Sequence, residues 1–567
     1  MKDQILKSYV EDFRSEIGYT ELTEDQCFER YVNYCLVSKQ YPRDFDIESL
    51  SPGGSNDIGV DGAAIIVNGN IIQAPEEVDF LVEKNGFIDV RFMFIQSKNS
   101  TKFKGDQVGT LIFGLKSFFS DEPSIPENEE IKTLREIKDR IYKNTIHLES
   151  PPELDIYFVT TGEWKQPEPI VGRVKLELKT FEESRLFSEI KFNFYDADKL
   201  KDTYREIRRK TVKEISFSNH VALPDILKIR QSFVGSIPAK EFVRLITDSS
   251  GELQKNLFED NIRDFQGRNK VNIGISDTLK NDELQSALSV LNNGITVIAK
   301  KVEPIGGKMK LTDFQIVNGC QSSHVLFDNK ELLQDNTHIV LKVIETTDQE
   351  LSHKVIQATN KQTLVTDEAF ESLSSFHRDL EEYYKARASG LNAPVYYERR
   401  SKQYEGVPSI HTNQVISLTA QIKAYVATIL AQPHSTHRYY GELLDANRNK
   451  MFREHDKKEP YFIACLGVNR LERAFKRGLI NSKYRNFKYQ ILYIAHCYHE
   501  VLRKSKPGYG YEEIIESYST IDTCLPIFNA ACTTIDTQSK NSKIPWRDAV
   551  RSRDFTDVLR KNLQKLM

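Results

Sequence analysis

Residues 56–62 read NDIGVDG, and residues 94–99 read FIQSKN. Two apolar runs and the turn NGN separate the aspartates of the first stretch from the Gln-x-Lys of the second. The pattern predicts a β-hairpin over 60–73, with Asp61 at its start, and a buried strand over 90–98. Gln96 and Lys98 are two apart on that strand, so their side chains point to one face of the sheet.

The residue types around this hairpin suit hydrolysis of a phosphodiester bond. That reaction uses a divalent cation to stabilise charge on the phosphate and to acidify a water. Mg²⁺ prefers hard oxygen ligands, and a neighbouring cationic side chain offsets developing negative charge. Asp61 and Lys98 supply these two groups, and a preceding helix offers a second acid: Glu29, or less favourably Asp25 or Glu24. Asn, Asp and Gly are also ordinary turn residues.

Taken together, NDIGVDG and FIQSK resemble the PD-(D/E)xK nuclease superfamily, in particular the Mrr-type restriction endonucleases, in which Gln-x-Lys replaces Glu-x-Lys. The resemblance covers about residues 20–210. It implies a mixed sheet flanked by helices and a DNA endonuclease that depends on Mg²⁺ or Mn²⁺. By position it implies the following roles: Asp61 and Gln96 as metal ligands, Lys98 as the catalytic lysine, Glu29 as the helix carboxylate that also binds metal, Asp57 as a supporting ligand, and the Ser97 carbonyl as an extra ligand. A degenerate, catalytically silent copy of the fold is the alternative.

Composition bears on the number of domains, on nucleic-acid contact and on membrane contact. The chain has 567 residues, 39% hydrophobic and 28% charged, with a net charge of −3, which predicts several ordinary globular domains. Nucleic-acid contact would therefore depend on local basic patches, such as SKNSTKFKG at 97–105, not on the overall field. The seven cysteines form no CxxC pair, and no segment predicts a membrane helix. These features predict a soluble cytoplasmic protein without membrane contact.

A second group of motifs occupies the middle of the chain. SVLNNGITVIA at 289–299 and FQIVNGCQSSHVL at 314–326 each place an Asn-Gly at a strand end, where a tight turn is expected. A helix after NGCQSS would present its N-terminal amides to an anion. Two ordinary turns explain the residues equally well.

As an ordered set, these segments resemble the AIPR family, the abortive-infection phage-resistance proteins. The matching residues are Phe258/Asn261/Arg263, Asn292–Thr296, Ile316–Gln321, Asn360/Gln362 and Tyr396/Tyr397/Arg400. Ser322 stands where the family more often has Thr, and we expect its hydroxyl to play the same part. The resemblance implies antiphage defence, and we expect a surface that binds a ligand or nucleic acid through Arg263, Asn293, Asn318, Gln321 and Arg400.

The C-terminal part reads as helical, with segments such as VISLTAQIKAYVATIL and YQILYIAHCYHEVLRK. Within it, Arg448-Asn449 followed by His455 is similar to the pattern of HEPN ribonucleases and is a second catalytic candidate.

The sequence therefore predicts an α/β (α+β) multidomain protein. Its predicted parts are a nuclease domain (1–215), a mixed α/β AIPR core (216–400) and a helical region (401–567). The preferred function is an antiphage effector that cleaves phage or host DNA with Mg²⁺, gated by a phage-derived trigger and working as a homodimer. The alternatives are a non-catalytic AIPR sensor or adaptor and an RNase using Arg448 and His455.

Overall fold

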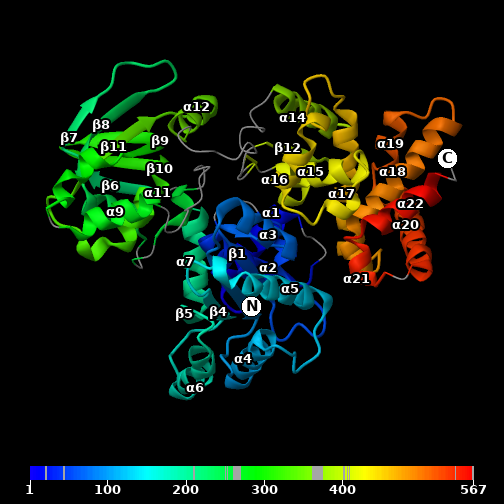
Figure 1. Cartoon of the computed structure of the whole chain (residues 1–567), viewed down its shortest axis with the longest axis horizontal. Helices are drawn as coiled ribbons and strands as arrows, with labels where there is room; N and C mark the ends of the chain where they lie inside the picture. Colours follow the sequence, from blue (N-terminus) through cyan, green and yellow to red (C-terminus); the bar gives the residue numbers. More distant parts are fainter. Residues whose placement is uncertain are drawn as a thin grey trace. The chain divides into compact units, whose positions relative to one another are not determined.

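The computed structural model contains two mixed β-sheets followed by a helical region, so the predicted mixed α/β fold class is confirmed (Figure 1). It describes residues 1–18, 22–41, 45–208, 211–248, 251, 253–258, 270–281, 283–360, 375–391, 393–399, 403–404, 407, 409–542 and 544–564. The chain divides into two compact units. One consists of Met1–Val10 with Phe28–Val365, and the other of Glu11–Cys27 with Thr366–Met567.

The first sheet has the strand order β2-β1-β3-β4-β5. Its strands are β1 (Gly62–Val67), β2 (Asn70–Ile71), β3 (Val90–Lys98), β4 (Glu153–Thr160) and β5 (Glu189–Tyr195). β1 pairs antiparallel with both β2 and β3, which confirms the predicted hairpin, whereas β3, β4 and β5 run parallel. The three parallel strands therefore end at one edge of the sheet, and that edge carries Lys98.

Helices accompany this sheet along the chain: α1 (Gln4–Ile17), α2 (Glu24–Gln40), α3 (Pro75–Asn85), α4 (Gly105–Phe119), α5 (Glu129–Lys143), α6 (Glu168–Ser184) and α7 (Ala197–Arg208). A capping box opens α2, because Thr23 Oγ accepts from the Gln26 amide and Gln26 Oε1 accepts from the Thr23 amide. α4 packs against α6. A core cluster lies between helices α3, α4, α5 and α6 and the apolar side chains of β1, β3 and β4.

The sequence predicts helices over 1–18, 23–40, 105–120, 130–144 and 199–210, and the observed helices α3 and α6 are not among them. α3 has strong local signals: Pro75 at its first turn and Gly86 at its C-cap with φ of +77°. α6 buries only Ile170, Val174 and Phe181, while Val171 and Leu176 are exposed. Its apolar residues therefore do not form one clear helical face.

The second sheet has the order β6-β10-β9-β11-β8-β7. Its strands are β6 (Val212–Ser216), β7 (Asn219–Ala222), β8 (Gln231–Pro238), β9 (Ile295–Ile305), β10 (Lys308–Asn318) and β11 (His338–Glu345). Its helices are α8 (Ala239–Ile246), α9 (Lys270–Lys280), α10 (Leu288–Leu291), α11 (Cys320–Asp328) and α12 (Gln349–Asn360). β9 and β10 form a long antiparallel pair, and β11 runs parallel to β9.

The last part of the chain is mainly helical, as expected. It contains α14 (Ser375–Ala388), the short strands β12 (Tyr396–Glu398) and β13 (Val415–Ser417), α15 (Leu418–Thr428), α16 (Tyr440–Asn447), α17 (Glu459–Lys476), α18 (Lys488–Ser505), α19 (Tyr511–Ser517), α20 (Ile521–Asn541), α21 (Trp546–Ala549) and α22 (Arg553–Gln564). All seven cysteines are buried, and none of them forms a disulfide. None of the helices in the described ranges is both long and apolar enough to cross a bilayer.

Candidate active site at the end of the first sheet

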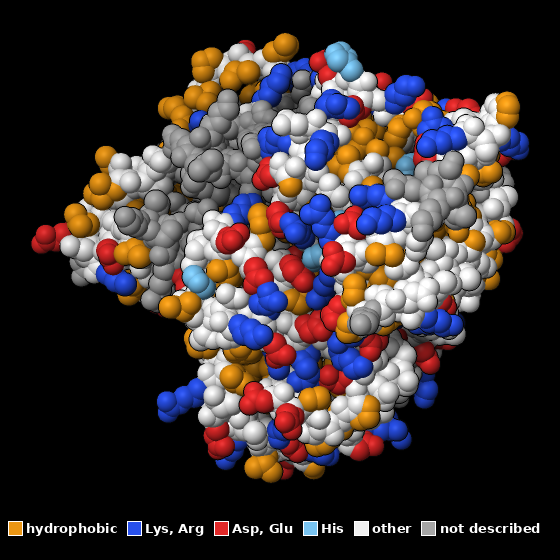
Figure 2. All heavy atoms as spheres, turned by 45° about the vertical axis from the view of Figure 1, so that its right-hand side comes forward, with side chains coloured by type: hydrophobic (Ala, Val, Ile, Leu, Met, Phe, Trp, Pro, Cys, Tyr) orange, Lys and Arg blue, Asp and Glu red, His pale blue; other side chains and the backbone are white. Residues whose placement is uncertain are grey.

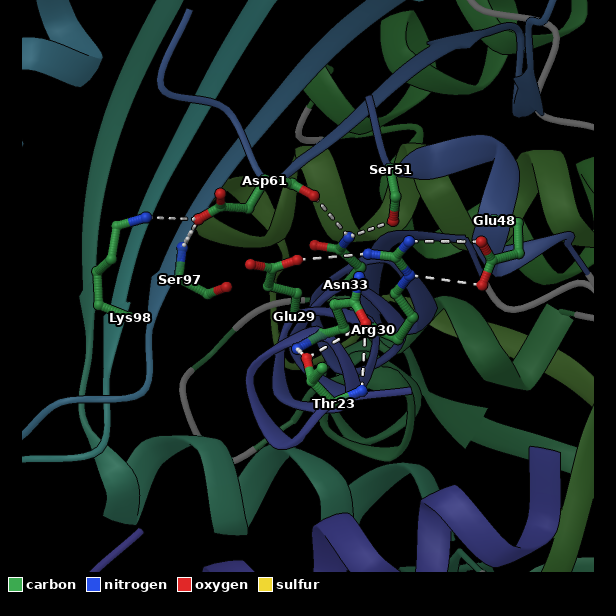
Figure 3. Close-up of polar contacts among 10 residues, drawn as sticks. Thr23, Glu29, Arg30, Asn33, Glu48, Ser51, Asp61, Ser97 and Lys98 are labelled. Carbon is green, nitrogen blue, oxygen red and sulfur yellow. Dashed lines mark hydrogen bonds and ion pairs between the residues drawn. The ribbon is translucent and has the colours of Figure 1, made fainter. Parts of the chain in front are cut away.

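Asp61 and Lys98 meet where the β1–β3 ladder ends (Figure 3). Lys98 Nζ donates to Asp61 Oδ2 at 3.1 Å, and the backbone N–H of Ser97 donates to the same oxygen at 2.8 Å. The Asp61 amide donates to the Ile95 carbonyl at 2.9 Å, so its backbone is fixed against β3. Strand pairing therefore brings an acid and an amine that are 37 residues apart in the sequence into direct contact.

Gln96 is buried, at 4% exposure, under the loop that leads to Asp61. Its Nε2 lies 3.5 Å from the position that a Cβ on Gly59 would take. Its Oε1 is buried and has no hydrogen-bond partner among the residues the structure describes. Leaving a buried acceptor unsatisfied costs on the order of 1–3 kcal/mol. The Gln96 carbonyl therefore retains the capacity to bind a water or a cation.

Helix α2 contacts the backbone of the acid through Asn33, a residue that the sequence motifs do not single out. Asn33 Nδ2 donates to the Asp61 carbonyl and to Ser51 Oγ, both at 3.1 Å. The approach is so close that a Cβ on Gly62 would lie 2.0 Å from Asn33 Oδ1. Only glycine at position 62 allows α2 to reach the start of β1.

Glu29 lies four residues before Asn33 on α2, one helical turn or about 5.4 Å along the axis. It is therefore on the side of the helix that faces the start of β1. Figure 3 shows its side chain extending from α2 toward Asp61 and Ser97. Its carboxylate accepts from Arg30 Nη1 at 3.4 Å, and Arg30 also bridges to Glu48 at 3.4 Å. Arg30 thus fixes the helix carboxylate from the side away from the sheet.

The loop before Asp61 has unusual backbone conformations. Asn56, Ile58 and Gly59 have φ of 62°, 55° and 81°, and a β-branched residue in this region is strained. The Asp57 carboxylate accepts from the Gly59 amide at 2.8 Å and closes the turn. Helix α4 supports the loop from outside, since a Cβ on Gly114 would lie 2.0 Å from the Ile58 carbonyl oxygen. The loop is therefore held in place by contacts beyond its own sequence.

Burial raises the pKa of the Asp61 carboxyl above its ordinary value. The Lys98 ammonium and the Ser97 N–H act in the opposite direction, while the nearby Asp57 charge adds to the rise. The net effect is a raised pKa, so the charge of ionised Asp61 is incompletely compensated by its described neighbours. A cation bound beside it would lower its free energy.

The side chains around Asp61 fit a magnesium-type ion, although few of them are carboxylates. No group of three or more His, Cys, Asp or Glu side chains is arranged for metal binding within the described part of the chain. Asp61 Oδ1 and Gln96 Oε1 are nevertheless two hard oxygens that no described side chain or amide engages. Mg²⁺ commonly binds one or two protein oxygens and keeps several waters.

The two Asn-Gly motifs of the second sheet also lie together. Asn318 ends β10 opposite Thr296 at the start of β9, so both turns are at the same edge of the sheet. Asn292 Nδ2 donates to Ser322 Oγ at 2.9 Å, and Asn292 Oδ1 accepts from the Gly294 amide at 3.1 Å. The Ser322 hydroxyl therefore ties NGCQSS to NNG.

The other residues that we expected to bind a ligand or nucleic acid differ in their exposure to solvent. Gln321 is buried and accepts from Asn272 Nδ2 at 2.7 Å, whereas Asn293 is exposed in its turn. Arg263 and Arg400 lie outside the described residues. The structure thus shows a hydrogen-bonded pair of turns with Asn293 at its surface.

Residues 258–561, more than half of the chain, match the family described as AIPR protein. The chain belongs to the AIPR family. No curated protein and no solved structure matches it. The AIPR match begins after the first sheet and includes the helical region, whereas the predicted AIPR core covers residues 216–400. Membership in the AIPR family suggests antiphage defence.

The second catalytic candidate lies inside the AIPR match. Arg448 begins a short 3-10 helix and pairs with Asp445 at 2.9 Å. His455 is exposed in a turn, and the two described side chains make no contact with each other. They are not arranged as a preformed acid–base pair.

Proposed function

We propose that this AIPR protein is an antiphage effector whose N-terminal sheet hydrolyses phosphodiester bonds of DNA with the help of Mg²⁺ or Mn²⁺. The observation that carries the proposal is the Asp61 carboxylate, bonded to Lys98 Nζ at 3.1 Å and to the Ser97 amide at 2.8 Å. An acid, an amide oxygen and an ammonium at one strand end are the groups that metal-assisted hydrolysis uses.

The metal would be held by Asp61 and Gln96, with the charges of Glu29 and Asp57 adding to the negative field around it. Asp61 Oδ1 and Gln96 Oε1 support this assignment because they have no described hydrogen-bond partner. When bound, the ion supplies charge stabilisation at the phosphate and an acidified water.

The protein's own groups then have separate tasks. The Ser97 N–H holds Asp61 Oδ2 in one orientation, which fixes the carboxylate without using its second oxygen. Lys98, half-exposed beside Asp61, is placed to orient a water or to offset negative charge on the phosphate. Ionisation of Asp61 is required to bind a cation, and the raised pKa makes that step dependent on pH.

We propose that the AIPR region senses infection or gates the nuclease, in response to a phage-derived trigger. The paired turns of Asn292 and Ser322 support a binding role, because they display the exposed amide of Asn293 on a hydrogen-bonded base. A homodimer is proposed on the ground that both strands of DNA must be cut.

A plasmid-degradation assay tests the catalytic proposal. Wild type, Lys98→Ala and His455→Ala are incubated with supercoiled DNA and Mg²⁺ or Mn²⁺, with EDTA as the metal-free control. Cleavage should require metal, vanish in Lys98→Ala and persist in His455→Ala. Equal cleavage by Lys98→Ala would refute the proposal, whereas RNA cleavage lost only in His455→Ala would favour the ribonuclease. Binding of a phage component without any cleavage would favour a non-catalytic sensor.

A further inference from the structure

A cluster of aromatic rings lies at the strand ends of the first sheet, beside the candidate active site. Phe103 belongs to the loop after β3, Trp164 to the loop after β4, and Phe194 to β5 itself. All three are half-buried. Ligands of open α/β sheets bind outside the carboxyl ends of parallel strands, and this cluster is in that position.

The two loops that carry Phe103 and Trp164 are fastened to each other. The Thr161 amide donates to the Ser100 carbonyl at 3.0 Å. A Cβ on Gly162 would lie 2.1 Å from the Thr101 carbonyl oxygen, so the two backbones are in direct contact. The Gly162 carbonyl also accepts from Ala197, at the start of α7. The rings are therefore held on a common, rigid base.

The arrangement of the rings leaves one face of the indole uncovered by aromatic neighbours. Trp164 stacks on Phe194 with centroids 3.8 Å apart and planes 13° apart. Phe103 lies 4.7 Å from Trp164 and 5.9 Å from Phe194, so the three centroids form nearly a right angle at Trp164. Phe194 is therefore under the indole face and Phe103 is beside its edge. Among the described residues no other ring contacts Trp164.

Strand register places this cluster on the face of the sheet that carries the catalytic candidates. Gln96 pairs with Phe158, and Phe158 pairs with Phe194, so these side chains share one face with Lys98. Lys98 pairs with Thr160 on β4, and Trp164 is four residues farther along. Four extended residues span at most about 14 Å. One strand of nucleic acid can reach both Lys98 and the indole.

The chain adds positive charge at the same place. Lys102 and Lys104 flank Phe103 and are both exposed. Neither forms an ion pair with any described carboxylate, whereas Lys165 pairs with Glu163 at 3.2 Å. On the face in Figure 2, Lys and Arg side chains alternate with Asp and Glu, without a continuous field of one sign. Local lysines beside the active site are therefore the available phosphate contacts.

We propose that Lys102, Phe103, Lys104, Trp164 and Phe194 form an aromatic-basic surface that binds single-stranded DNA beside the cleavage site. An unstacked base would lie on the indole face opposite Phe194, and Lys102 and Lys104 would contact adjacent phosphates. The inference rests on the proposed nuclease function and specifies its substrate as single-stranded or locally opened DNA, because bases inside a duplex cannot stack on a side chain.

The test measures binding without cleavage. A fluorescent oligo(dT) and a duplex of equal length are titrated with the full chain in EDTA, and anisotropy gives the dissociation constants. Trp164→Ala should weaken binding of the single strand about ten- to hundredfold, and Trp164→Phe should restore most of it. Trp546→Ala, which removes the other of the two tryptophans, should have no effect. Thermal unfolding of each variant verifies folding.

Salt dependence tests the lysines separately. Each phosphate contact on a single strand contributes about 0.7 to the slope of log affinity against log salt concentration. The double variant Lys102→Ala/Lys104→Ala should therefore lower that slope by about 1.4. Lys143→Ala, at the exposed C-terminal end of α5, is the matched control and should leave the slope unchanged.

Intrinsic fluorescence gives a direct readout of stacking. In a Trp546→Phe protein, Trp164 is the single tryptophan, and a saturating oligonucleotide should quench its emission. Unchanged emission, unchanged single-strand affinity in Trp164→Ala, or preference of the wild type for the duplex would each overturn the proposal.

The outcomes distinguish a failure of the DNA-binding proposal from a failure of the nuclease proposal. Asp61→Asn should bind the oligonucleotide as the wild type does while losing metal-dependent cleavage. If the wild type binds through Trp164 but never cleaves, the nuclease proposal fails and the surface stands. If cleavage depends on Lys98 but not on Trp164, the surface proposal fails alone.

Discussion

Strand β3 carries a cation near each end, and the two are held in different ways. Arg91 contacts two carboxylates of β4, Asp155 at 2.6 Å and Glu153. Burial opposes its charge, but the two acids prevail and raise the pKa of the guanidinium above its ordinary value. Lys98 contacts one carboxylate, Asp61, whose own pKa burial raises.

This difference indicates that the Arg91 ion pairs stabilise the fold, whereas the groups around Lys98 can still bind a further partner. At the Arg91 end, each charged group has a partner of opposite sign. At the Lys98 end, the buried Gln96 carbonyl and Ser97 hydroxyl have no described partner. Incompletely satisfied polar groups in one place are more common at functional sites than in structural pairs.

The largest expected effect is on catalysis. Lys98→Ala should lower metal-dependent DNA cleavage by about 10²–10³-fold or more, because it removes a positioned charge from the reacting centre. Thermal unfolding should change little, since Lys98 is partly exposed. Arg91→Lys at the other end of β3 is the matched control. A similar loss of cleavage in that variant would show that both pairs act through the fold.

The second effect separates the pairs by stability. Asp155→Asn should destabilise the N-terminal sheet by about 3–5 kcal/mol, because it removes the buried partner of the half-buried Arg91. Asp61→Asn should cause no loss at neutral pH, since the folded protein disfavours the ionised acid. Urea unfolding of the two variants measures the contrast. Equal losses would show that Asp61 is also a structural partner.

The proximity of Asp61 and Lys98 could be predicted from the sequence because strand periodicity and turn residues are local. Gln96 and Lys98 share a face by the two-residue period alone, and the hairpin places Asp61 opposite them. The middle motifs were recognised as an ordered set, and the AIPR match confirms the family.

Contacts that depend on tertiary approach were not predictable in this way. Nothing in the sequence spacing indicates that Asn33 lies so close to position 62 that only glycine fits there. The indole of Trp164 joins Phe103 and Phe194 only after three strands align in parallel. Helix α6 was missed because exposed Val171 and Leu176 obscure its apolar face.

The pH dependence of stability gives a further test of how the Asp61 and Arg91 ion pairs differ. The pKa of Asp61 is raised in the folded protein. Asp61 therefore stabilises the fold at pH values below 3.8, its ordinary pKa, and this contribution is lost as the pH rises through the folded-state pKa. The stability of Asp61→Asn relative to wild type should therefore increase as the pH rises above about 4, and level off above the folded-state pKa of Asp61. Saturating Mn²⁺ should reduce the difference by stabilising ionised Asp61. A difference that shrinks with rising pH would contradict the assigned burial cost.

A smaller effect is expected at Gln96. Gln96→Leu should weaken Mn²⁺ binding about tenfold or more, since it removes an available ligand oxygen. It should not reduce stability, because it also removes a buried unsatisfied acceptor. Isothermal titration with Mn²⁺ and thermal unfolding measure the two properties. Unchanged affinity would exclude Gln96 as a ligand.

The smallest effect concerns the AIPR turns. Ser322→Ala removes the hydroxyl that joins NGCQSS to NNG and should cost about 1 kcal/mol. Ser322→Thr should retain the bond. Denaturation of the two variants checks this, with no change expected in DNA cleavage by the N-terminal sheet in the absence of a trigger.

The carbonyl of Ile58 rests where helix α4 has Gly114, and any larger residue there would place a Cβ 2.0 Å from that oxygen. The conformation of the loop 52–62 therefore depends on the residue at position 114 of α4. Chimaeras between relatives should exchange the segments 52–62 and 105–119 together, because a donor helix with alanine at this position would displace the loop that leads to Asp61.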